Sequence, residues 1–410
     1  MPPNFYEWHD REKALPQNNP NLPPPQGRRG KYIWFRNNVK NLGWGNIMQE
    51  IVFNAHLAYV TKRIYVFDNY TWDPYSDWMY ADYNGKPIPA RIPLTAILAG
   101  PIAGEPFPPQ AGVPPAVIPE FFKEICPEPL VIDREEVNHN LGDASATEIV
   151  QAWVDKLATI DDSCVEIERL SAQIFDFWLF GSADRLVGFW PTLIESPIMK
   201  HFKWSPLITS AVEANRALIH PAISPGDAHR APLPGLLALH IRRGDFIDHC
   251  MHLANWSAHY MGFNAFPQLP DRFEPPAGGG GGFNTPDGYA TYRRHCHPEI
   301  SEIVERVREV VESPLGKGLD RVYVLTNGKN DWLDELKIEL RRVAKWKSIS
   351  TSRDMSLTPE QKAVGQSIDM LIAQRSDVFI GNGFSSLTSN VVMVRQAQNT
   401  SLPWDKIRFW

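Results

Sequence analysis

The sequence predicts an α/β protein made of two successive domains, each built on a parallel sheet. The 410 residues are enough for two hydrophobic cores. A strand, a glycine turn, a helix and a second strand follow one another from residue 31, and strands alternate with helices again after residue 230. We therefore expect a flexible arm over residues 1–30, a first α/β domain over 31–230 and a second over 231–410.

The first domain opens with the pattern of a parallel α/β unit. Residues 31–36 are a short apolar strand, residues 41–46 a glycine turn, and residues 47–61 carry apolar side chains at helical spacing. A second strand follows at residues 63–68. Residues 87–119 are rich in proline and show little periodicity, so we expect a long surface excursion there.

The second domain repeats the α/β rhythm more clearly. An insertion at residues 250–298 interrupts it and contains a run of glycines at residues 278–282, so we expect this insertion to be mobile. The expected strands are residues 236–241, 321–326 and 377–381, and the expected helices are residues 300–311, 331–344, 358–374 and 385–395.

The charge and hydropathy of the chain exclude some classes of partner. It has 41 basic and 47 acidic residues and a net charge of −6. General nucleic-acid binding relies on a basic face, so nucleic acid is not an expected partner. No run of about 18 apolar residues is present, so this chain encodes no membrane span. The first residues also lack the basic and apolar regions of a signal peptide.

Three glycosylation sequons begin at Asn69, Asn255 and Asn399. Each can accept a glycan in a secretory compartment. They favour slightly a location in the lumen of the endoplasmic reticulum or Golgi, with any anchor absent from this chain. A cytoplasmic location stays open.

The cysteines leave three alternatives open. They are Cys126, Cys164, Cys250 and Cys296. None forms a Cys-x-x-Cys pair, which argues against a zinc ribbon or a thioredoxin site. In an oxidising compartment Cys250 and Cys296 can form a disulfide across the insertion. The alternatives are a zinc site completed by His249 and His297, or free buried thiols.

The first candidate binding segment is the glycine turn that contains Gly43, Gly45 and Asn46. Glycines let the backbone approach a phosphate or a sugar, and the helix that follows presents free N–H groups at its positive end. The turn lacks the last glycine of the dinucleotide fingerprint, because Gln49 stands near that place. A tight turn that serves packing alone is the alternative.

The second candidate segment begins at the end of an apolar strand and holds His240, Arg242, Arg243 and Asp245. Strand alternation puts His240 and Arg242 on the same side. A guanidinium at this edge can bind a diphosphate through two hydrogen bonds and stays ionised at any working pH. The alternative is an ion pair between one of the arginines and Asp245.

The third candidate segment runs from Asp377 through a Gly-Asn-Gly turn at residues 381–383 to a helix that opens with hydroxyl side chains. The hydroxyls are those of Ser385, Ser386 and Thr388. They can cap the helix, and together with the helix amides they can bind phosphate. A carboxylate such as that of Asp377 can accept both N–H groups of the guanine edge, although Asp377 can also be a surface charge.

These segments, in this order, resemble those of the GDP-fucose protein O-fucosyltransferases, and the chain is similar to a divergent member of fungal type. Residues 369–388 carry the strongest resemblance, followed by residues 240–245 and then the turn at 43–46. Residues 322–327 also fit the family. The resemblance implies two Rossmann-like domains that face a cleft, the GT-B type, with the donor GDP-fucose held mainly by the second domain.

The resemblance also implies roles for the candidate residues. Arg242 would hold the diphosphate, with His240 beside the nucleotide. Asp377 would contact guanine, and Asn46 would face the fucose and the acceptor, close to Gly43 and Gly45. Ser385, Ser386 and Thr388 would bind phosphate.

The expected chemistry is an inverting transfer of fucose to a Ser/Thr hydroxyl of a protein, without a metal or a cofactor. Arg242 and the helix that starts at Ser385 would stabilise the charge that builds on the leaving diphosphate. Asp245 and Glu50 are both candidates for the base. The alternatives are a glycan or small-molecule acceptor, a non-catalytic relative that binds GDP or glycans, and a dinucleotide oxidoreductase.

Overall fold

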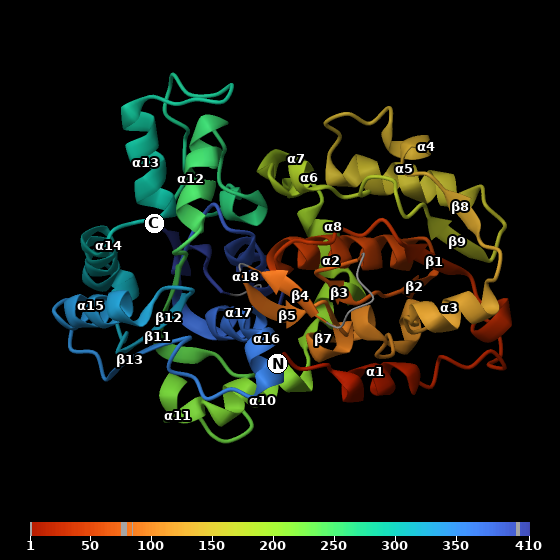
Figure 1. The fold of residues 1–410 in the computed structure, drawn as a ribbon, viewed down its shortest axis with the longest axis horizontal. Helices are drawn as coiled ribbons and strands as arrows, with labels where there is room; N and C mark the ends of the chain where they lie inside the picture. Colours follow the sequence, from red (N-terminus) through yellow and green to blue (C-terminus); the bar gives the residue numbers. More distant parts are fainter. Residues whose placement is uncertain (1, 75–79, 84, 399–401) are drawn as a thin grey trace. The chain divides into compact units, whose positions relative to one another are not determined.

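The described chain forms two compact units, each an α/β structure with its own parallel sheet (Figure 1). The computed structural model describes residues 2–74, 80–83, 85–398 and 402–410. The first unit comprises Met1–Phe180, Asp184–Ile208 and Thr358–Val364, and the remaining residues form the second. The boundary therefore lies near residue 208, whereas the sequence placed it near 230, and a short later segment returns to the first unit.

The helices of the first unit are mostly short. They are α1 (Tyr6–Lys13), α2 (Trp44–Val60), α3 (Pro119–Ile125), α4 (Glu135–Asn138), α5 (Ala146–Ala158), α6 (Phe177–Phe180), α7 (Ala183–Val187), α8 (Trp190–Glu195), α9 (Pro197–Lys200) and α16 (Pro359–Ala363). Its strands are β1 (Tyr32–Phe35), β2 (Ile64–Val66), β3 (Tyr70–Thr71), β4 (Tyr80–Tyr83), β5 (Lys86–Pro89), β6 (Arg91–Ile92), β7 (Leu98–Ala99), β8 (Leu130–Ile132), β9 (Cys164–Ile167) and β10 (Lys203–Trp204).

The second unit holds the longer strands. Its helices are α10 (Pro206–Ala214), which begins at the boundary, α11 (Arg216–Ile219), α12 (Phe246–Asn255), α13 (Pro286–Cys296), α14 (Ile300–Glu312), α15 (Asn330–Arg341), α17 (Gly365–Arg375) and α18 (Ser386–Gln398). Its strands are β11 (Leu233–Ile241), β12 (Arg321–Thr326), β13 (Ser348–Thr351), β14 (Ser376–Gly381) and β15 (Ile407–Phe409).

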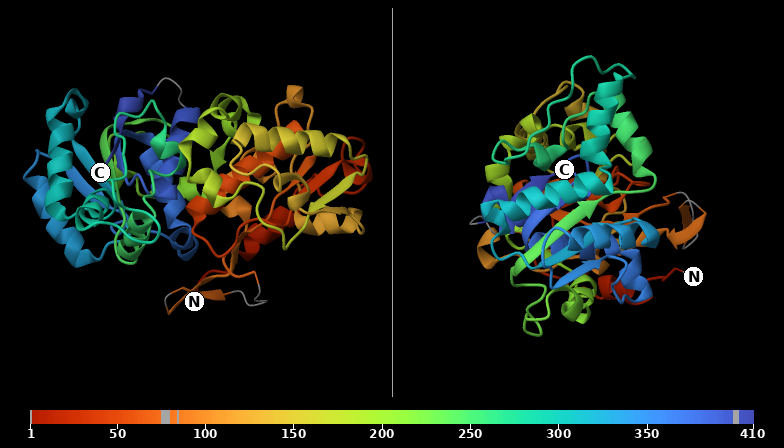
Figure 2. Two further views of the ribbon diagram at one scale, coloured as in Figure 1. Left: turned by 90° about the horizontal axis from the view of Figure 1, so that it is seen from above. Right: turned by 90° about the vertical axis from the view of Figure 1, so that its left-hand side faces the viewer.

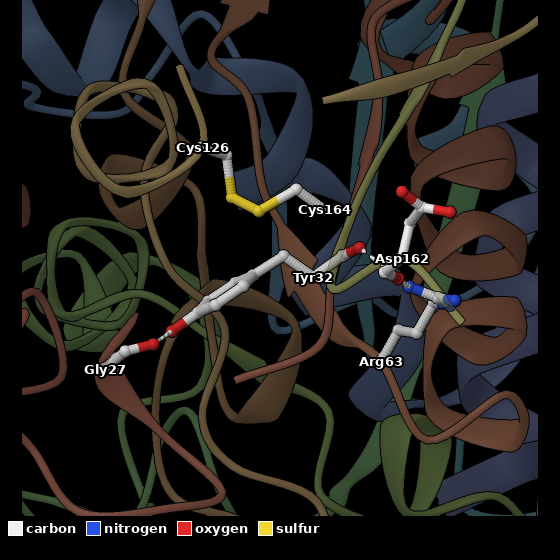
Figure 3. Close-up of a disulfide and its surroundings, with 6 residues drawn as sticks. All are labelled: Gly27, Tyr32, Arg63, Cys126, Asp162 and Cys164. Atoms are coloured by element: carbon white, nitrogen blue, oxygen red, sulfur yellow. Dashed lines mark hydrogen bonds between the residues drawn. A yellow bond between two sulfur atoms is a disulfide. The ribbon is translucent and has the colours of Figure 1, made fainter. Parts of the chain in front are cut away.

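The sheet of the first unit has the order β2-β1-β9-β8, and all its strands are parallel. Tyr32 and Trp34 on β1 lie against Phe122 of α3 in edge-to-face contacts. A disulfide between Cys126 and Cys164 joins the end of α3 to the start of β9 (Figure 3). The bond therefore fixes this helix over the strand beside β1.

The N-terminal segment is packed, which corrects the expectation of a flexible arm over residues 1–30. It contains α1, and Phe5 just before this helix is buried. The buried carboxylate of Glu12 accepts hydrogen bonds from the backbone and hydroxyl of Thr95. The buried side chain of Gln17 donates to the carbonyls of Gly104 and Ala116. Polar anchors of this kind leave no periodic pattern in a Pro-rich sequence.

The Pro-rich residues 87–119 are also not a surface excursion. Leu94, Leu98 and Ile102 are completely buried, and short strands and 3₁₀ turns alternate through this stretch. Each apolar group is too short to show a helical or strand period, so the sequence pattern concealed its burial.

The sheet of the second unit has the order β13-β12-β11-β14-β15 and is entirely parallel. Helices cover both of its faces (Figure 1, Figure 2). Leu237 and Leu239 of β11 pack with α14 and α15 in one hydrophobic core. His240 and Tyr323 point to the other face, where α17 and α18 lie. The expected helix at 358–374 is two helices, because the backbone leaves helical geometry at Val364.

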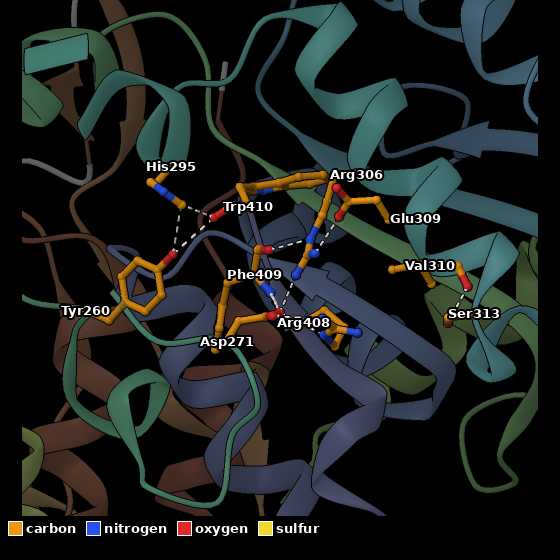
Figure 4. Close-up of polar contacts among 10 residues, drawn as sticks. All are labelled: Tyr260, Asp271, His295, Arg306, Glu309, Val310, Ser313, Arg408, Phe409 and Trp410. Carbon is orange, nitrogen blue, oxygen red and sulfur yellow. Dashed lines mark hydrogen bonds and ion pairs between the residues drawn. The ribbon is translucent and has the colours of Figure 1, made fainter. Parts of the chain in front are cut away.

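An ion network holds the last strand of the second unit (Figure 4). Asp271 accepts two hydrogen bonds of 2.8 Å from the guanidinium of Arg408 and also pairs with Arg306. Its carboxylate accepts the backbone N–H of Phe409 as well. Asp271 belongs to the insertion that we expected to be mobile, so this part of the insertion is tied to the sheet.

The sequon residue Asn255 is the last residue of α12, and its Oδ1 accepts a hydrogen bond from the hydroxyl of Tyr289. The sequon at Asn399 lies outside the described residues. Over the described ranges, no helix combines the length and the apolar character that crossing a bilayer requires.

Removal of the first disulfide should destabilise the protein. The Cys126–Cys164 bond closes a loop with a sequence separation of 38. Replacing both cysteines by serine should lower the free energy of unfolding by about 3–4 kcal/mol, because the unfolded chain regains loop entropy. Thermal unfolding measures this, with the unchanged protein in reductant as the control. An unchanged melting temperature would contradict the prediction.

Candidate functional site

Two of the three candidate segments meet at the carboxyl edge of the second sheet. β11 and β14 are parallel neighbours, and Leu239 pairs with Ile380 near their ends. His240 Nδ1 lies 2.7 Å from Thr388 Oγ1, in a buried hydrogen bond between the end of β11 and the first turn of α18. Ligands of parallel α/β sheets bind beyond this edge.

The turn between β14 and α18 is fixed by its own polar groups. The backbone N–H of Asn382 donates to Thr388 Oγ1 over 3.2 Å, and Asn382 Oδ1 accepts the N–H of Phe384. A Cβ on Gly381 would lie 2.3 Å from the Thr388 side chain. Only glycine therefore lets the first turn of the helix lie directly against the end of the strand.

The start of α18 has the features of an anion site. The first N–H groups of a helix have no carbonyl partner within it, and the helix dipole makes this end positive. Ser385 is buried and Ser386 half-buried at this point. The amides and hydroxyls here are the groups that commonly bind a phosphate.

His240 is neutral at this edge. Burial and, to a smaller extent, the nearby positive charge of Arg242 lower its pKa to about 3. The indole N–H of Trp410 donates to the carbonyl of His240 over 2.8 Å. His240 therefore acts as a fixed polar group and carries no positive charge of its own.

The two neighbouring arginines differ in their surroundings. The Arg243 guanidinium is buried, lies 4.2 Å from the ring centre of Trp332 and donates to His297. Arg242 keeps 29% of its side chain exposed and lies over the ring of Phe246 at 4.7 Å. Arg242 is therefore the one that a ligand can reach, and Arg243 serves packing.

Asn327 braces the loop that carries both arginines. The backbone N–H of Arg243 donates to Asn327 Oδ1 over 2.7 Å, and Asn327 Nδ2 donates back to the Arg243 carbonyl over 2.9 Å. Asp245 lies 4.0 Å from Arg242 and is largely exposed. An exposed pair at that distance contributes about 0–1 kcal/mol, so it does not prevent Arg242 from binding an anion.

Asp377 does not join this group, which corrects its expected place beside guanine. It lies at the start of β14, and the amino end of a six-residue strand is roughly 17–20 Å from its carboxyl end. Its carboxylate accepts the N–H of Gly235 over 2.9 Å and pairs with Lys406 over 2.6 Å. Burial alone would raise its pKa, but these partners hold the pKa of Asp377 below its ordinary value.

A different carboxylate, Asp369 on α17, lies at the carboxyl edge. It accepts hydrogen bonds of 2.8 Å from the hydroxyls of Tyr323 and Ser352. Ser352 follows β13 directly and also accepts the N–H of Thr326, the last residue of β12. Burial raises the pKa of Asp369 to about 7. Sequence reasoning missed its role, although residues 369–388 carried the strongest resemblance.

The first candidate segment, the glycine turn, lies in the first unit, at the start of α2. Gly43 precedes the helix, and the half-buried Asn46 is in its first turn, with its N–H donating to the Gly43 carbonyl. Gly45 is buried within the same turn. Trp44 packs on Tyr70, so the turn also has a packing role.

Glu50, one of the two candidate bases, lies one turn further along α2. Its carboxyl accepts the N–H of Val39 over 2.7 Å, and it is almost fully buried. Burial raises the pKa of Glu50 to about 8. This carboxyl is therefore largely protonated at neutral pH. Through its hydrogen bond with Val39 it holds the loop that follows β1.

The cysteine alternatives are resolved in favour of disulfides. Cys250 is bonded to Cys296, which joins α12 to α13, so these two sulfurs are not zinc ligands. Within the described residues, no group of three or more His, Cys, Asp or Glu side chains is placed to hold a metal ion.

Two α/β units, each with its own parallel sheet, form the fold of a GT-B glycosyltransferase. The model of the GDP-fucose protein O-fucosyltransferase family matches residues 22–398. The chain belongs to this family of fucosyltransferases. No curated protein sequence matches it significantly.

One solved structure supports the fold, and two further matches are more distant. The chain is similar to POFUT1 in complex with GDP at 15% identity and a TM-score of 0.50, over 92% of this chain and 97% of that one. POFUT1 in complex with GDP-fucose gives 16% identity and a TM-score of 0.48, over 92% and 97%. A variant of Arabidopsis thaliana FUT1 in complex with GDP gives 10% identity and a TM-score of 0.39, over 96% and 75%.

Replacing Asp377 by asparagine should reduce stability and leave nucleotide binding intact. The variant loses the charge paired with Lys406, at an expected cost of about 1–2 kcal/mol. Because the folded pKa of Asp377 is depressed, the wild-type advantage is full above the ordinary value of 3.8 and disappears as the pH falls through the folded pKa. Urea unfolding across this pH range measures it. A large loss of GDP affinity would contradict the structural role.

Proposed function

We propose that this protein is an inverting, metal-independent fucosyltransferase that moves fucose from GDP-fucose to a Ser/Thr hydroxyl of a protein. The observation that carries the proposal is the hydrogen bond between His240 and Thr388. It places the segment that bears Arg242 beside the amino end of α18. Membership of the family supports GDP-fucose as the donor, and the description of the family favours a protein as the acceptor.

The proposed chemistry is stabilisation of the leaving diphosphate. When the bond between the anomeric carbon and the phosphate oxygen breaks, negative charge builds on GDP. The Arg242 guanidinium and the N–H of Ser386 would supply fixed positive charge and a donor at this edge, while the N–H of Ser385 is bonded to the Asn382 carbonyl over 3.0 Å. The Thr388 hydroxyl is bonded to His240 behind them. These groups would do the work without a metal ion.

The acceptor hydroxyl would attack the anomeric carbon from the face opposite the diphosphate, which inverts the sugar. Its proton leaves to a base or to solvent. Asp245, largely exposed beside Arg242, is better suited to accept it than Glu50, which burial keeps protonated at neutral pH. We place Asn46, at the start of α2, on the side of fucose and acceptor.

Asp369 is our candidate for reading the guanine base. A carboxylate has about four lone-pair sites, so it can accept the N1–H and N2–H of guanine while it keeps its bonds to Tyr323 and Ser352. It lies at the carboxyl edge that also holds Arg242, unlike Asp377. The paired disulfides favour the secretory lumen as the place of action.

Replacing Arg242 by alanine should lower the rate of fucose transfer about 100- to 1000-fold, the usual effect of losing one preorganised charge contact. A transfer assay with GDP-fucose, peptide acceptors and excess chelator measures this and tests the function itself. Arg294→Ala is the matched control, because its side chain in the same unit is 69% exposed.

Full activity of the Arg242→Ala variant would end the mechanism. If fucose is transferred only to glycan acceptors, the proposal of a protein acceptor is wrong. If chelator abolishes the wild-type rate, the proposal of a metal-independent reaction is wrong. A chain that binds GDP yet neither transfers nor hydrolyses GDP-fucose would be a non-catalytic relative.

Replacing Asp369 by asparagine should remove selectivity for guanine. The wild type should bind GDP about tenfold more tightly than inosine diphosphate, which lacks the 2-amino group, because each lost bond to a charged acceptor costs about 1.5 kcal/mol. The variant should bind the two alike. Calorimetry measures both, and Asp354→Asn, which removes the carboxylate bonded to Lys337 and Thr351, is the control. Retained selectivity in the Asp369 variant would exclude this role.

A further inference from the structure

The insertion at residues 250–298 holds the turn that leads into α18. Its residues contact both the backbone and the side chains of this turn, residues 382–385. Asn382 Nδ2 donates to the carbonyl of Cys296 over 2.6 Å, and the N–H of Met261 donates to the carbonyl of Gly383 over 2.9 Å. This part of the chain carried no family resemblance in the sequence.

Asn264 makes the most specific of these contacts. Its Nδ2 donates to the carbonyl of Gly383 over 2.9 Å and to the carbonyl of Ser385 over 3.2 Å. The side chain is completely buried, and its Oδ1 has no hydrogen-bond partner among the described residues. The protein thus bears the cost of an unpaired buried oxygen at the place where this amide group holds two carbonyls.

The geometry of the peptide group gives these bonds a consequence for the ligand. In a trans peptide the C=O of one residue and the N–H of the next point in opposite directions. The carbonyl of Ser385 is held by Asn264 and also accepts the helical N–H of Ser389 over 3.0 Å. The N–H of Ser386 therefore points away from Asn264. That N–H is one of the donors we assign to the diphosphate.

Aromatic packing keeps the turn in the same place. A Cβ on Gly383 would lie 2.4 Å from the ring of Tyr260, so the insertion is in direct contact with this glycine. Phe384 packs among the rings of Tyr260, Phe273 and Tyr292. The rings set the position of the turn, and Asn264 sets the orientation of its peptides.

We propose that Asn264 is a positioning residue for the donor diphosphate: it aims the N–H of Ser386, the first amide of α18, by holding the carbonyl of Ser385, and it braces the turn before the helix through the carbonyl of Gly383. The inference rests on the proposed GDP-fucose site and deepens it. It assigns a role in donor binding to an insertion outside the recognised segments.

The test is GDP binding by the Asn264→Asp variant across pH. At pH 8 the new carboxylate repels the two carbonyls, and the dissociation constant for GDP should rise about tenfold or more relative to wild type at the same pH. Burial raises the pKa of such a carboxyl, so near pH 5 it is protonated and can donate again. The ratio of the two constants should then fall towards one. Calorimetry with GDP measures it.

Asn284→Asp is the matched control. Asn284 is a buried asparagine of the same insertion, and its Nδ2 donates to the carbonyl of Ala254, away from the turn. The melting temperature of this variant should fall by about as much as that of Asn264→Asp, while its affinity for GDP should stay at the wild-type value. Where Asn264→Asp does not fold, the neutral Asn264→Ser, whose hydroxyl is too short to reach the carbonyls, should weaken GDP binding equally at both pH values.

The outcomes separate this inference from the function on which it rests. A wild type that does not bind GDP overturns both. A wild type that binds GDP, with folded Asn264 variants of unchanged affinity, overturns the positioning role alone. Equal losses in the Asn264 and Asn284 variants, without recovery at low pH, would also overturn it, because they would indicate a general effect on the insertion.

Discussion

The buried hydrogen bond between His240 and Thr388 is the contact on which the donor edge depends. This bond forms only because β11 and β14 end side by side and because Gly381 leaves room for the threonine. Burial keeps the imidazole uncharged, so the bond lasts through the physiological pH range. The arginine loop and the start of α18 are thus held in one geometry before any nucleotide arrives, which is the condition for electrostatic stabilisation of a leaving group.

The surroundings of this edge are as ordered as the edge itself. Asn327 fixes the backbone of the arginine loop from the side of β12, and the insertion fixes the turn before α18 from the other side. Arg243 and Asp377 resemble ligand-binding residues in sequence, yet both make structural contacts. Arg243 lies over the ring of Trp332, and Asp377 forms an ion pair with Lys406. Of the charged side chains near the proposed site, Arg242 stays partly exposed, while Arg243 and Asp377 are engaged by neighbouring residues.

Much of the second unit could be predicted, because its strands are long and buried and its helices strongly amphipathic. The same sequence signals placed His240 and Arg242 at the end of a strand and Ser385 just before a helix, which is where the structure has them. The sequence placed Asp377 correctly at the start of its strand, but the expected contact with guanine overlooked that this end of the strand lies opposite the turn that leads into α18. Asn264 left no signal, since a single buried amide in irregular chain has no period. The packed segment at residues 1–30 was missed for the same reason.

Each unit has one disulfide that is confined to its own residues. Four cysteines allow three pairings, and the observed one alone joins no cysteine of one unit to a cysteine of the other. The Cys126–Cys164 bond can therefore form before the cysteines of the second unit have been synthesised, although the segment Thr358–Val364 joins the first unit only later. Mispairing would require a covalent link between the two units.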